Sequence, residues 1–185
     1  MVDYPSSEHD DGSGANMILP GQLNGLLDIF LPNNLLFVDL RSPTDFDKSH
    51  IYGAINLRTP VSFIEQSFDL IDRAFTDDQS RRNFARAPSS CCVVFYDRVL
   101  EFPWECPMAD ALIGKLREDK GWAGDYYVLR GHYREFSTSF DKYITGDRMT
   151  QAAKDYADSL RQRTPPTPVS CVLCNDQGPV VQTSC

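Results

Sequence analysis

The sequence predicts an α/β fold with a mainly parallel sheet of about five strands and helices on both faces. Two short runs, residues 35–40 and 91–96, are almost continuously apolar, as expected for strands that are covered on both sides. Segments with apolar residues at helical spacing alternate with such runs, which favours parallel strands joined by helical crossovers. The 185 residues, 42% of them hydrophobic, are enough for one sizeable core.

Ordered structure is expected to begin near Met17 with a short strand. Apolar residues at helical spacing then predict an amphipathic helix with this stripe: Leu23, Leu26, Leu27, Phe30 and Leu31. The Pro-Asn-Asn sequence at residues 32–34 ends this helix, and the strand at residues 35–40 follows.

The next element combines three signals of a helix start. Ser42 fits the N-cap, Pro43 the first helical position and Asp45 the first turn, so a helix is predicted to run to about Lys48. Residues 50–57 then carry a glycine turn into a third strand.

Two capping boxes follow, Ser-Phe-Ile-Glu at residues 62–65 and Thr-Asp-Asp-Gln at residues 76–79. The first predicts a helix whose inner stripe is Phe63, Ile64, Phe68, Ile71 and Phe75. The second predicts a shorter helix carrying Arg81, Arg82 and Arg86.

The later elements surround Asp97, which directly follows the apolar run at residues 91–96. A loop at residues 98–106 leads into an amphipathic helix that ends at about Lys120. Residues 126–129 are predicted to be the last strand, and a short helix begins within residues 131–136. A final helix is predicted from Thr150 to about Gln162.

These elements predict one domain over residues 17–163, including the C-terminal helix. Residues 1–16 hold four acids and no Lys or Arg, which is typical of a disordered acidic tail. Residues 164–185 begin with a proline-rich stretch and are expected to be a flexible tail.

Composition excludes several classes of function. The formal net charge of −8 argues against nucleic-acid binding, which requires clustered Lys and Arg. A membrane span and a signal peptide are not expected, because the chain lacks a run of eighteen apolar residues and a charged-then-apolar start. We therefore expect an intracellular protein, cytoplasmic or nuclear, with reduced cysteines and without a cofactor.

One cysteine pair has the spacing of metal ligands, Cys171 with Cys174. A structural zinc site needs two further ligands, and only Cys185 follows in a segment that lacks histidine. No metal site is therefore expected.

Residues 37–46, Phe-Val-Asp-Leu-Arg-Ser-Pro-Thr-Asp-Phe, and residues 50–58, His-Ile-Tyr-Gly-Ala-Ile-Asn-Leu-Arg, resemble the strand–helix–strand signature of rhodanese-like domains. Residues 93–97 and 127–136 extend the resemblance over about residues 17–145. Catalytic rhodaneses, and the related phosphatases that activate cyclin-dependent kinases, carry cysteine directly after the fourth strand. The non-catalytic domain that begins dual-specificity MAP kinase phosphatases has Val-Val-x-Tyr-Asp there, and this chain is similar to that version.

The resemblance implies a degenerate catalytic site at Asp97. Phosphoryl or sulfur transfer on this scaffold needs a thiolate held by backbone N–H groups, and a carboxylate would repel the anion bound there. The phosphatase form also needs an arginine six residues after the cysteine, where this chain has Pro103. Cys106 stands at a helix start but is followed by Asp110 and by no nearby arginine, so a structural role is favoured. The domain is therefore predicted to be catalytically inactive.

The resemblance also implies docking of a protein partner, in particular a MAP kinase. In that family, arginines beside aliphatic residues engage an acidic groove on the kinase. Arg58 matches the arginine of the family's Asn-x-Arg phrase, but no basic cluster follows it. The nearest substitute is Arg73, Arg81, Arg82 and Arg86, of which the last two are expected to share a helix face. An ordinary solvated helix surface is an equally good interpretation.

Two alternatives remain open. The chain is also consistent with the inactive rhodanese-like adaptor of ubiquitin proteases, or with a divergent sulfurtransferase or phosphatase that uses Cys106. Because the phosphatase signature His-Cys-(x)5-Arg is absent, the chain is either a fragment of a larger phosphatase or an adaptor acting alone. Leu100, Phe102 and Trp104 in the loop form either a contact patch for a partner or part of a loop that packs back over the sheet end. His50 is expected to be structural, and His132 and His9 belong to no catalytic constellation.

Overall fold

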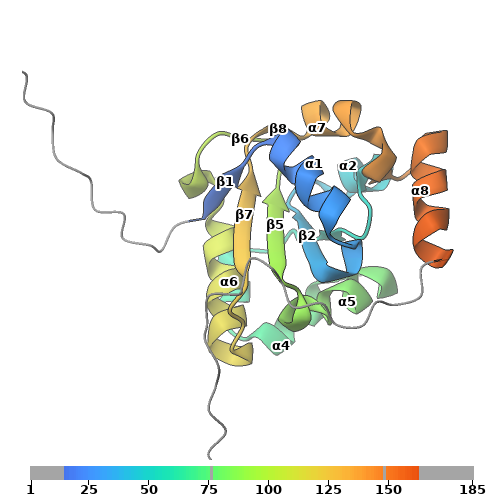
Figure 1. The fold of residues 1–185 in the computed structure, drawn as a ribbon. Helices are drawn as coiled ribbons and strands as arrows, with labels where there is room; N and C mark the ends of the chain where they lie inside the picture. Colours follow the sequence, from blue (N-terminus) through green and yellow to red (C-terminus); the bar gives the residue numbers. More distant parts are fainter. Residues whose placement is uncertain (1–14, 76, 148, 163–185) are drawn as a thin grey trace, which may run out of the picture.

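A computed structural model describes residues 15–75, 77–147 and 149–162, and its centre is a five-stranded parallel sheet (Figure 1). The strand order is β1-β7-β5-β2-β4. The strands are β1 (Asn16–Ile18), β2 (Leu35–Asp39), β4 (Ile55–Asn56), β5 (Cys92–Tyr96) and β7 (Asp125–Leu129). The predicted fold class is confirmed.

Strands β2 and β5 are buried over their whole length because side chains alternate between two apolar layers. One layer takes Leu36, Val38, Val93 and Phe95 from these strands. The other layer takes Leu35, Phe37, Cys92, Val94 and Tyr96. This burial on both faces explains why the two runs are nearly continuous apolar sequence.

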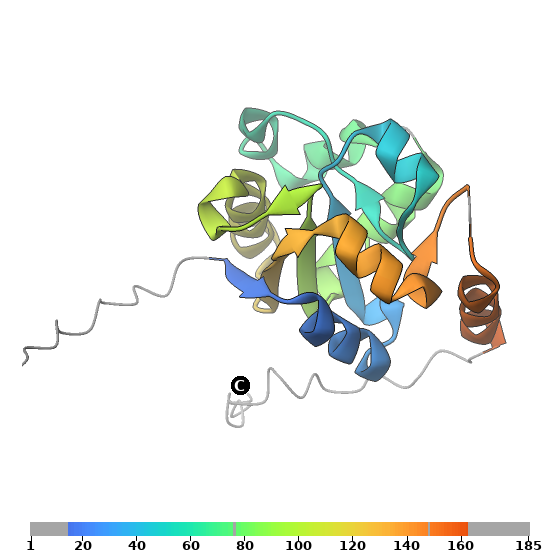
Figure 2. The same ribbon diagram turned by 90° about the horizontal axis from the view of Figure 1, so that it is seen from above.

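Helices cover each face of the sheet (Figure 2). One face carries α3 (Val61–Ile64), α4 (Phe68–Ile71), α5 (Asp78–Phe84) and α6 (Pro107–Lys120). The other carries α1 (Pro20–Ile29) and α7 (Tyr133–Ser139), with α2 (Pro43–Lys48) and α8 (Gln151–Gln162) packing at its margin. Five 3-10 turns connect described elements: η1 (Pro32–Asn34), η2 (Asp72–Ala74), η3 (Ala87–Ser89), η4 (Pro103–Glu105) and η5 (Asp141–Tyr143).

Helices α2 and α6 have the ends that their sequences predict. The Ser42 hydroxyl accepts a hydrogen bond from the Asp45 backbone N–H at 3.2 Å, and α2 ends at Lys48. Helix α6 ends at Lys120 because Gly121 adopts a left-handed conformation, with φ 64°, that other residues rarely take.

The single helix predicted from residue 62 is wrong, because the chain forms α3, α4 and η2 in its place. The N-cap of α3 is Pro60, which makes no side-chain cap. The helix is interrupted before Phe68, whose backbone N–H donates to the Asp119 carboxylate of α6 at 2.9 Å. This N–H therefore bonds to another element instead of continuing α3.

Helix α5 also differs from its prediction. Its N-cap is Asp77, which accepts from the Ser80 backbone N–H at 2.6 Å, and Thr76 lies outside the described residues. The helix ends at Phe84, so the prediction that Arg82 and Arg86 share a helix face is wrong. Arg86 lies beyond the C-cap residue Ala85, at the position that precedes η3.

Two small antiparallel sheets were not predicted. The predicted glycine turn lies at Gly53, whose φ is 81°, and leads into β4, whereas the short strand β3 (His50–Ile51) before it was not predicted. Strand β3 pairs with β9 (Ile144–Thr145), and β6 (Val99–Leu100) pairs with β8 (Gly131–His132). Strands β8 and β9 follow β7, so the prediction that residues 126–129 form the last strand is wrong.

Residues 1–14 and 163–185 lie outside the described residues, as do most of the two predicted tails and Cys171, Cys174 and Cys185. In the described part of the chain, no helix is long and apolar enough to cross a membrane.

Candidate binding site at the carboxyl end of the sheet

The segments that follow β2, β5 and β7 meet at one edge of the sheet, because these strands are parallel neighbours. They enclose a pocket of about 330 Å³, lined by Arg41, Asp45, Arg98, His132, Tyr133 and Arg134. None of these six lining residues is a cysteine, so the pocket wall offers no thiol nucleophile.

Arg41 is held in the wall of this pocket by a buried ion pair with Asp39. Its Nη2 lies 2.6 Å from one oxygen of Asp39 and its Nε 3.0 Å from the other. The guanidinium also donates to the Ser49 carbonyl at 2.6 Å and lies 3.6 Å from the centre of the Tyr133 ring. Burial disfavours the charged form, but the hydrogen bonds to Asp39 outweigh it and raise the pKa of Arg41. The positive charge of Arg41 is therefore neutralised by a carboxylate of the same chain.

The other two arginines of the pocket are exposed. Arg98 forms an ion pair with Asp45 at 2.9 Å, and this contact, after the Ser42 hydroxyl, lowers the pKa of Asp45. Arg134 has no ion pair with any described residue. Two of the three guanidinium groups are thus already paired with carboxylates of the chain.

Asp97 directly follows β5 and is half-buried. Its Oδ1 accepts a hydrogen bond from the Arg98 backbone N–H at 2.6 Å. The side chain thus bonds to the first loop amide, which would otherwise be available to a bound anion.

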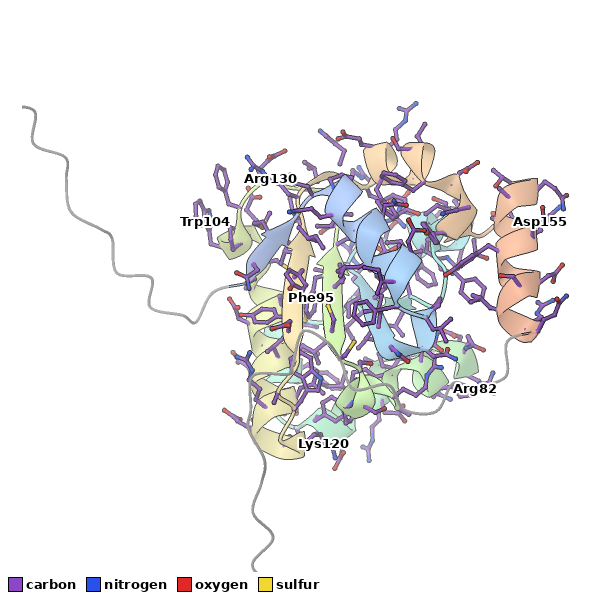
Figure 3. The ribbon with its side chains drawn as sticks, viewed as in Figure 1. Arg82, Phe95, Trp104, Lys120, Arg130 and Asp155 are labelled. Atoms are coloured by element: carbon purple, nitrogen blue, oxygen red, sulfur yellow. The ribbon has the colours of Figure 1, made fainter. Side chains whose placement is uncertain are left out.

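The loop after Asp97 is tied to the rest of the domain by β6, in which Val99 is paired with His132 and Leu100 with Gly131. Leu100 is buried in the core, whereas Phe102 and Trp104 are 47% and 73% exposed. Their rings stack 4.5 Å apart, and Trp104 projects away from the sheet (Figure 3). The two aromatic residues form an exposed apolar pair and do not cover the sheet end.

Cys106 lies at the start of α6 and is only 1% exposed. Burial, with a smaller contribution from the negative charges of Asp110 and Asp97, raises the pKa of its thiol to about 11. At neutral pH the side chain is therefore a protonated thiol, not the thiolate that acts as a nucleophile.

The arginines predicted to bind a partner come from different elements. Arg58 follows β4 and Arg73 lies in η2, and both are exposed. On α5, Arg81 pairs with Asp78 at 3.1 Å and Arg82 contacts Gln79 at 3.4 Å. Arg82 and Trp104 project from opposite sides of the molecule (Figure 3).

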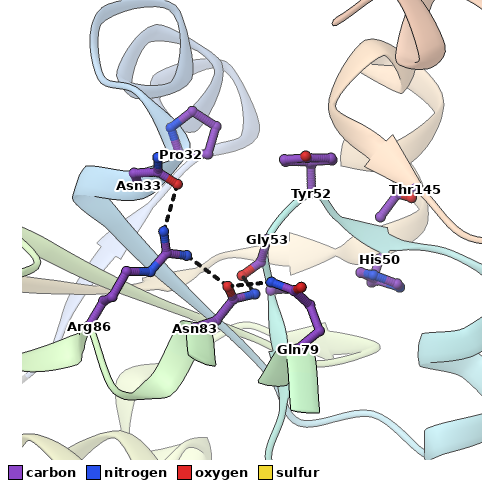
Figure 4. A pocket seen from close by; sticks show the side chains of 10 residues that line it. Pro32, Asn33, His50, Tyr52, Gly53, Gln79, Asn83, Arg86 and Thr145 are labelled. Carbon is purple, nitrogen blue, oxygen red and sulfur yellow. Dashed lines mark hydrogen bonds between the residues drawn. The ribbon is translucent and has the colours of Figure 1, made fainter. Parts of the chain in front are cut away.

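Arg86 does not extend the surface of α5, because its guanidinium turns toward η1 (Figure 4). It donates to Asn33 and to Asn83, both at 2.7 Å. The residue therefore braces η1 against the end of α5.

Sequence reasoning missed the Asp39–Arg41 pair and the pairing of β6 with β8. A signal for the first was present, since a buried strand that ends in a carboxylate needs a cationic partner. The pairing of β6 with β8 leaves no signal in the sequence, because a two-residue strand is too short to show alternation of apolar and polar residues.

The family model described as rhodanese-like domain matches residues 26–139, and no curated protein matches the chain. An As-Sb reductase from Leishmania major is similar in fold, with 17% identity, a TM-score of 0.48, and coverage of 80% of this chain and 99% of the reductase. A Saccharomyces cerevisiae homolog of single-domain rhodanese and the Cdc25 phosphatase catalytic domain has 14% identity and a TM-score of 0.47, covering 71% of this chain and 88% of that one. The match of the family model over more than half of the sequence shows that the chain belongs to the rhodanese-like domain family.

Proposed function

We propose that this chain is a catalytically inactive rhodanese-like module that binds a protein partner. The observation that carries the proposal is the carboxylate of Asp97 at the end of β5, hydrogen-bonded to the first amide of the following loop. A catalytic rhodanese needs a cysteine thiolate at this point, and a fixed negative charge opposes both the thiolate and an anionic substrate.

The state of Cys106 supports the same proposal against a divergent thiol enzyme. With a pKa of about 11 the thiol is almost entirely protonated at neutral pH, and its burial limits access by a substrate. Cys106 is also absent from the lining of the pocket at the carboxyl end of the sheet.

We further propose that the partner is a MAP kinase and that the module is the docking domain of a dual-specificity phosphatase. Arg58 and Arg73 are exposed and have no ion pair with any described residue, so they remain available to carboxylates of a partner. Arg81 and Arg82 add two exposed guanidinium groups on α5. Such groups can bind carboxylates through two parallel hydrogen bonds.

The test is a charge reversal on α5, Arg81→Glu with Arg82→Glu. We expect binding to a MAP kinase to weaken at least about tenfold, since one lost hydrogen bond between charged groups is worth about 1.5–3 kcal/mol. Thermal stability is expected to change little, because the Arg81–Asp78 pair is exposed. Calorimetry measures the affinity.

The matched control is Lys154→Glu with Arg161→Glu, which makes the same change of net charge on the exposed side of α8. Equal affinity of the wild type and the α5 variant for the kinase would remove α5 from the docking surface. A pull-down against MAP kinases and ubiquitin ligases separates the kinase-docking proposal from the adaptor of ubiquitin proteases: capture of only the ligases would contradict kinase docking.

A further inference from the structure

A second pocket, of about 370 Å³, lies beside the edge strand β4 (Figure 4). It extends from η1, which directly precedes β2, to His50, in the segment that leads into β4. The lining residues are Pro32, Asn33, His50, Tyr52, Gly53, Ala54, Gln79, Asn83, Arg86 and Thr145.

This pocket carries a positive charge that no acidic lining residue offsets. None of its ten lining residues is acidic, and Arg86 contributes a permanent positive charge. The two hydrogen bonds of the Arg86 guanidinium, to Asn33 and Asn83, go to neutral amide oxygens. Among the described residues it has no ion-pair partner, and only two of its five N–H groups are engaged. The pocket at the carboxyl end of the sheet differs, because it includes the carboxylate of Asp45 and two of its three arginines, Arg41 and Arg98, are paired with carboxylates.

The guanidinium of Arg86 is held in place before any ligand arrives. Asn83 is only 3% exposed, and its amide donates to the Gly53 carbonyl at 2.9 Å. The Asn83 oxygen that accepts from Arg86 also accepts from Gln79 at 2.9 Å. Because two elements fix the orientation of the cation, a ligand would lose little free energy in ordering it.

His50 supplies a complementary group. Its Nδ1 lies 2.7 Å from the Phe46 carbonyl oxygen, which can only accept, so Nδ1 carries the hydrogen. The ring also stacks on Phe46 at 3.8 Å. Burial lowers the pKa of His50, which keeps the ring neutral at pH 7 and leaves Nε2 as an acceptor.

We propose that this pocket binds a small molecule carrying one phosphate or carboxylate group. The oxyanion accepts hydrogen bonds from the unused N–H groups of Arg86, whose planar guanidinium matches the geometry of a phosphate and of a carboxylate. His50 Nε2 is then available to a hydroxyl or amine of the same ligand. The volume is at the lower end of the range for small-molecule sites, which suits a compact metabolite.

The experiment is an NMR titration of the full chain with inorganic phosphate and, separately, with acetate at constant ionic strength. We expect a saturable shift of the side-chain amides of Gln79 and Asn83 and of the Gly53 backbone amide. The anion that binds more tightly identifies the chemical class. Absence of saturable shifts for both anions, or shifts confined to Arg98 and His132 of the pocket at the carboxyl end of the sheet, would overturn the proposal.

Two variants sharpen this test. Arg86→Gln is expected to weaken binding at least tenfold, whereas Arg161→Gln, which makes the same change of net charge on α8, is expected to leave the affinity unchanged. Equal loss in both variants would indicate general electrostatic attraction and contradict a built site. If Arg86→Gln does not fold, the residue-resolved shifts of the wild type decide the question.

Discussion

The buried pair of Asp39 and Arg41 shows how one residue pair organises the carboxyl end of the sheet. Asp39 is fully buried and accepts hydrogen bonds from the backbone N–H and the guanidinium of Arg41. Asn56 donates to the backbone carbonyls of both residues, at 3.0 and 2.9 Å. Removing charges from water is costly, so the arrangement persists only because each charge has these partners.

Replacing one member of this pair leaves the other charge buried without compensation. Asp39→Ala is therefore expected to lower the free energy of unfolding by about 3–5 kcal/mol, measured by chemical denaturation. The control is Asp78→Ala, which removes an exposed partner of Arg81 and is expected to have little effect. Similar small losses in both variants would mean that the pair at the sheet edge contributes no more than a surface ion pair.

At the scale of elements, the ends of helices could be predicted from residues within the same turn. Contacts between segments that are distant in the sequence could not. The ends of α2 and α6 follow from Ser42, Pro43 and Gly121, which act within their own turns. The break between α3 and α4 depends on Asp119, 51 residues beyond Phe68. A pattern in residues 61–75 carries no information about that partner.

The capping interaction of α2 can be tested against a serine at the same position of α4. Ser42→Ala is expected to cost about 1 kcal/mol, because its hydroxyl accepts from a first-turn N–H. Ser67 is the N-cap of α4 but makes no side-chain cap, so Ser67→Ala is expected to cost much less. Denaturant midpoints of the two variants give the comparison, and equal losses would show that the cap of α2 contributes nothing measurable.

For the whole molecule, the two pockets differ in character, because the lining at the carboxyl end of the sheet includes a carboxylate and the lining beside Arg86 does not. The position of Asp97 at the carboxyl end could be predicted, because it directly follows a recognisable buried strand. The ion pair of Arg98 could not, because its carboxylate partner, Asp45, lies on α2, and the contact depends on how α2 and the loop after β5 fold over the sheet end. The pocket beside Arg86 was also beyond prediction, because it is assembled from η1, α5, β9 and the segment from His50 to Ala54.

The inactivity of the carboxyl end is the central claim of this account, and a turnover assay tests it most directly. The purified chain is assayed with a phosphotyrosine analogue and with thiosulfate, beside Cys106→Ser. Because Asp97 stands at the end of β5 and the Cys106 thiol is protonated, we predict no turnover by the wild type above that of the variant. Turnover by the wild type that disappears in Cys106→Ser would contradict the predicted inactivity.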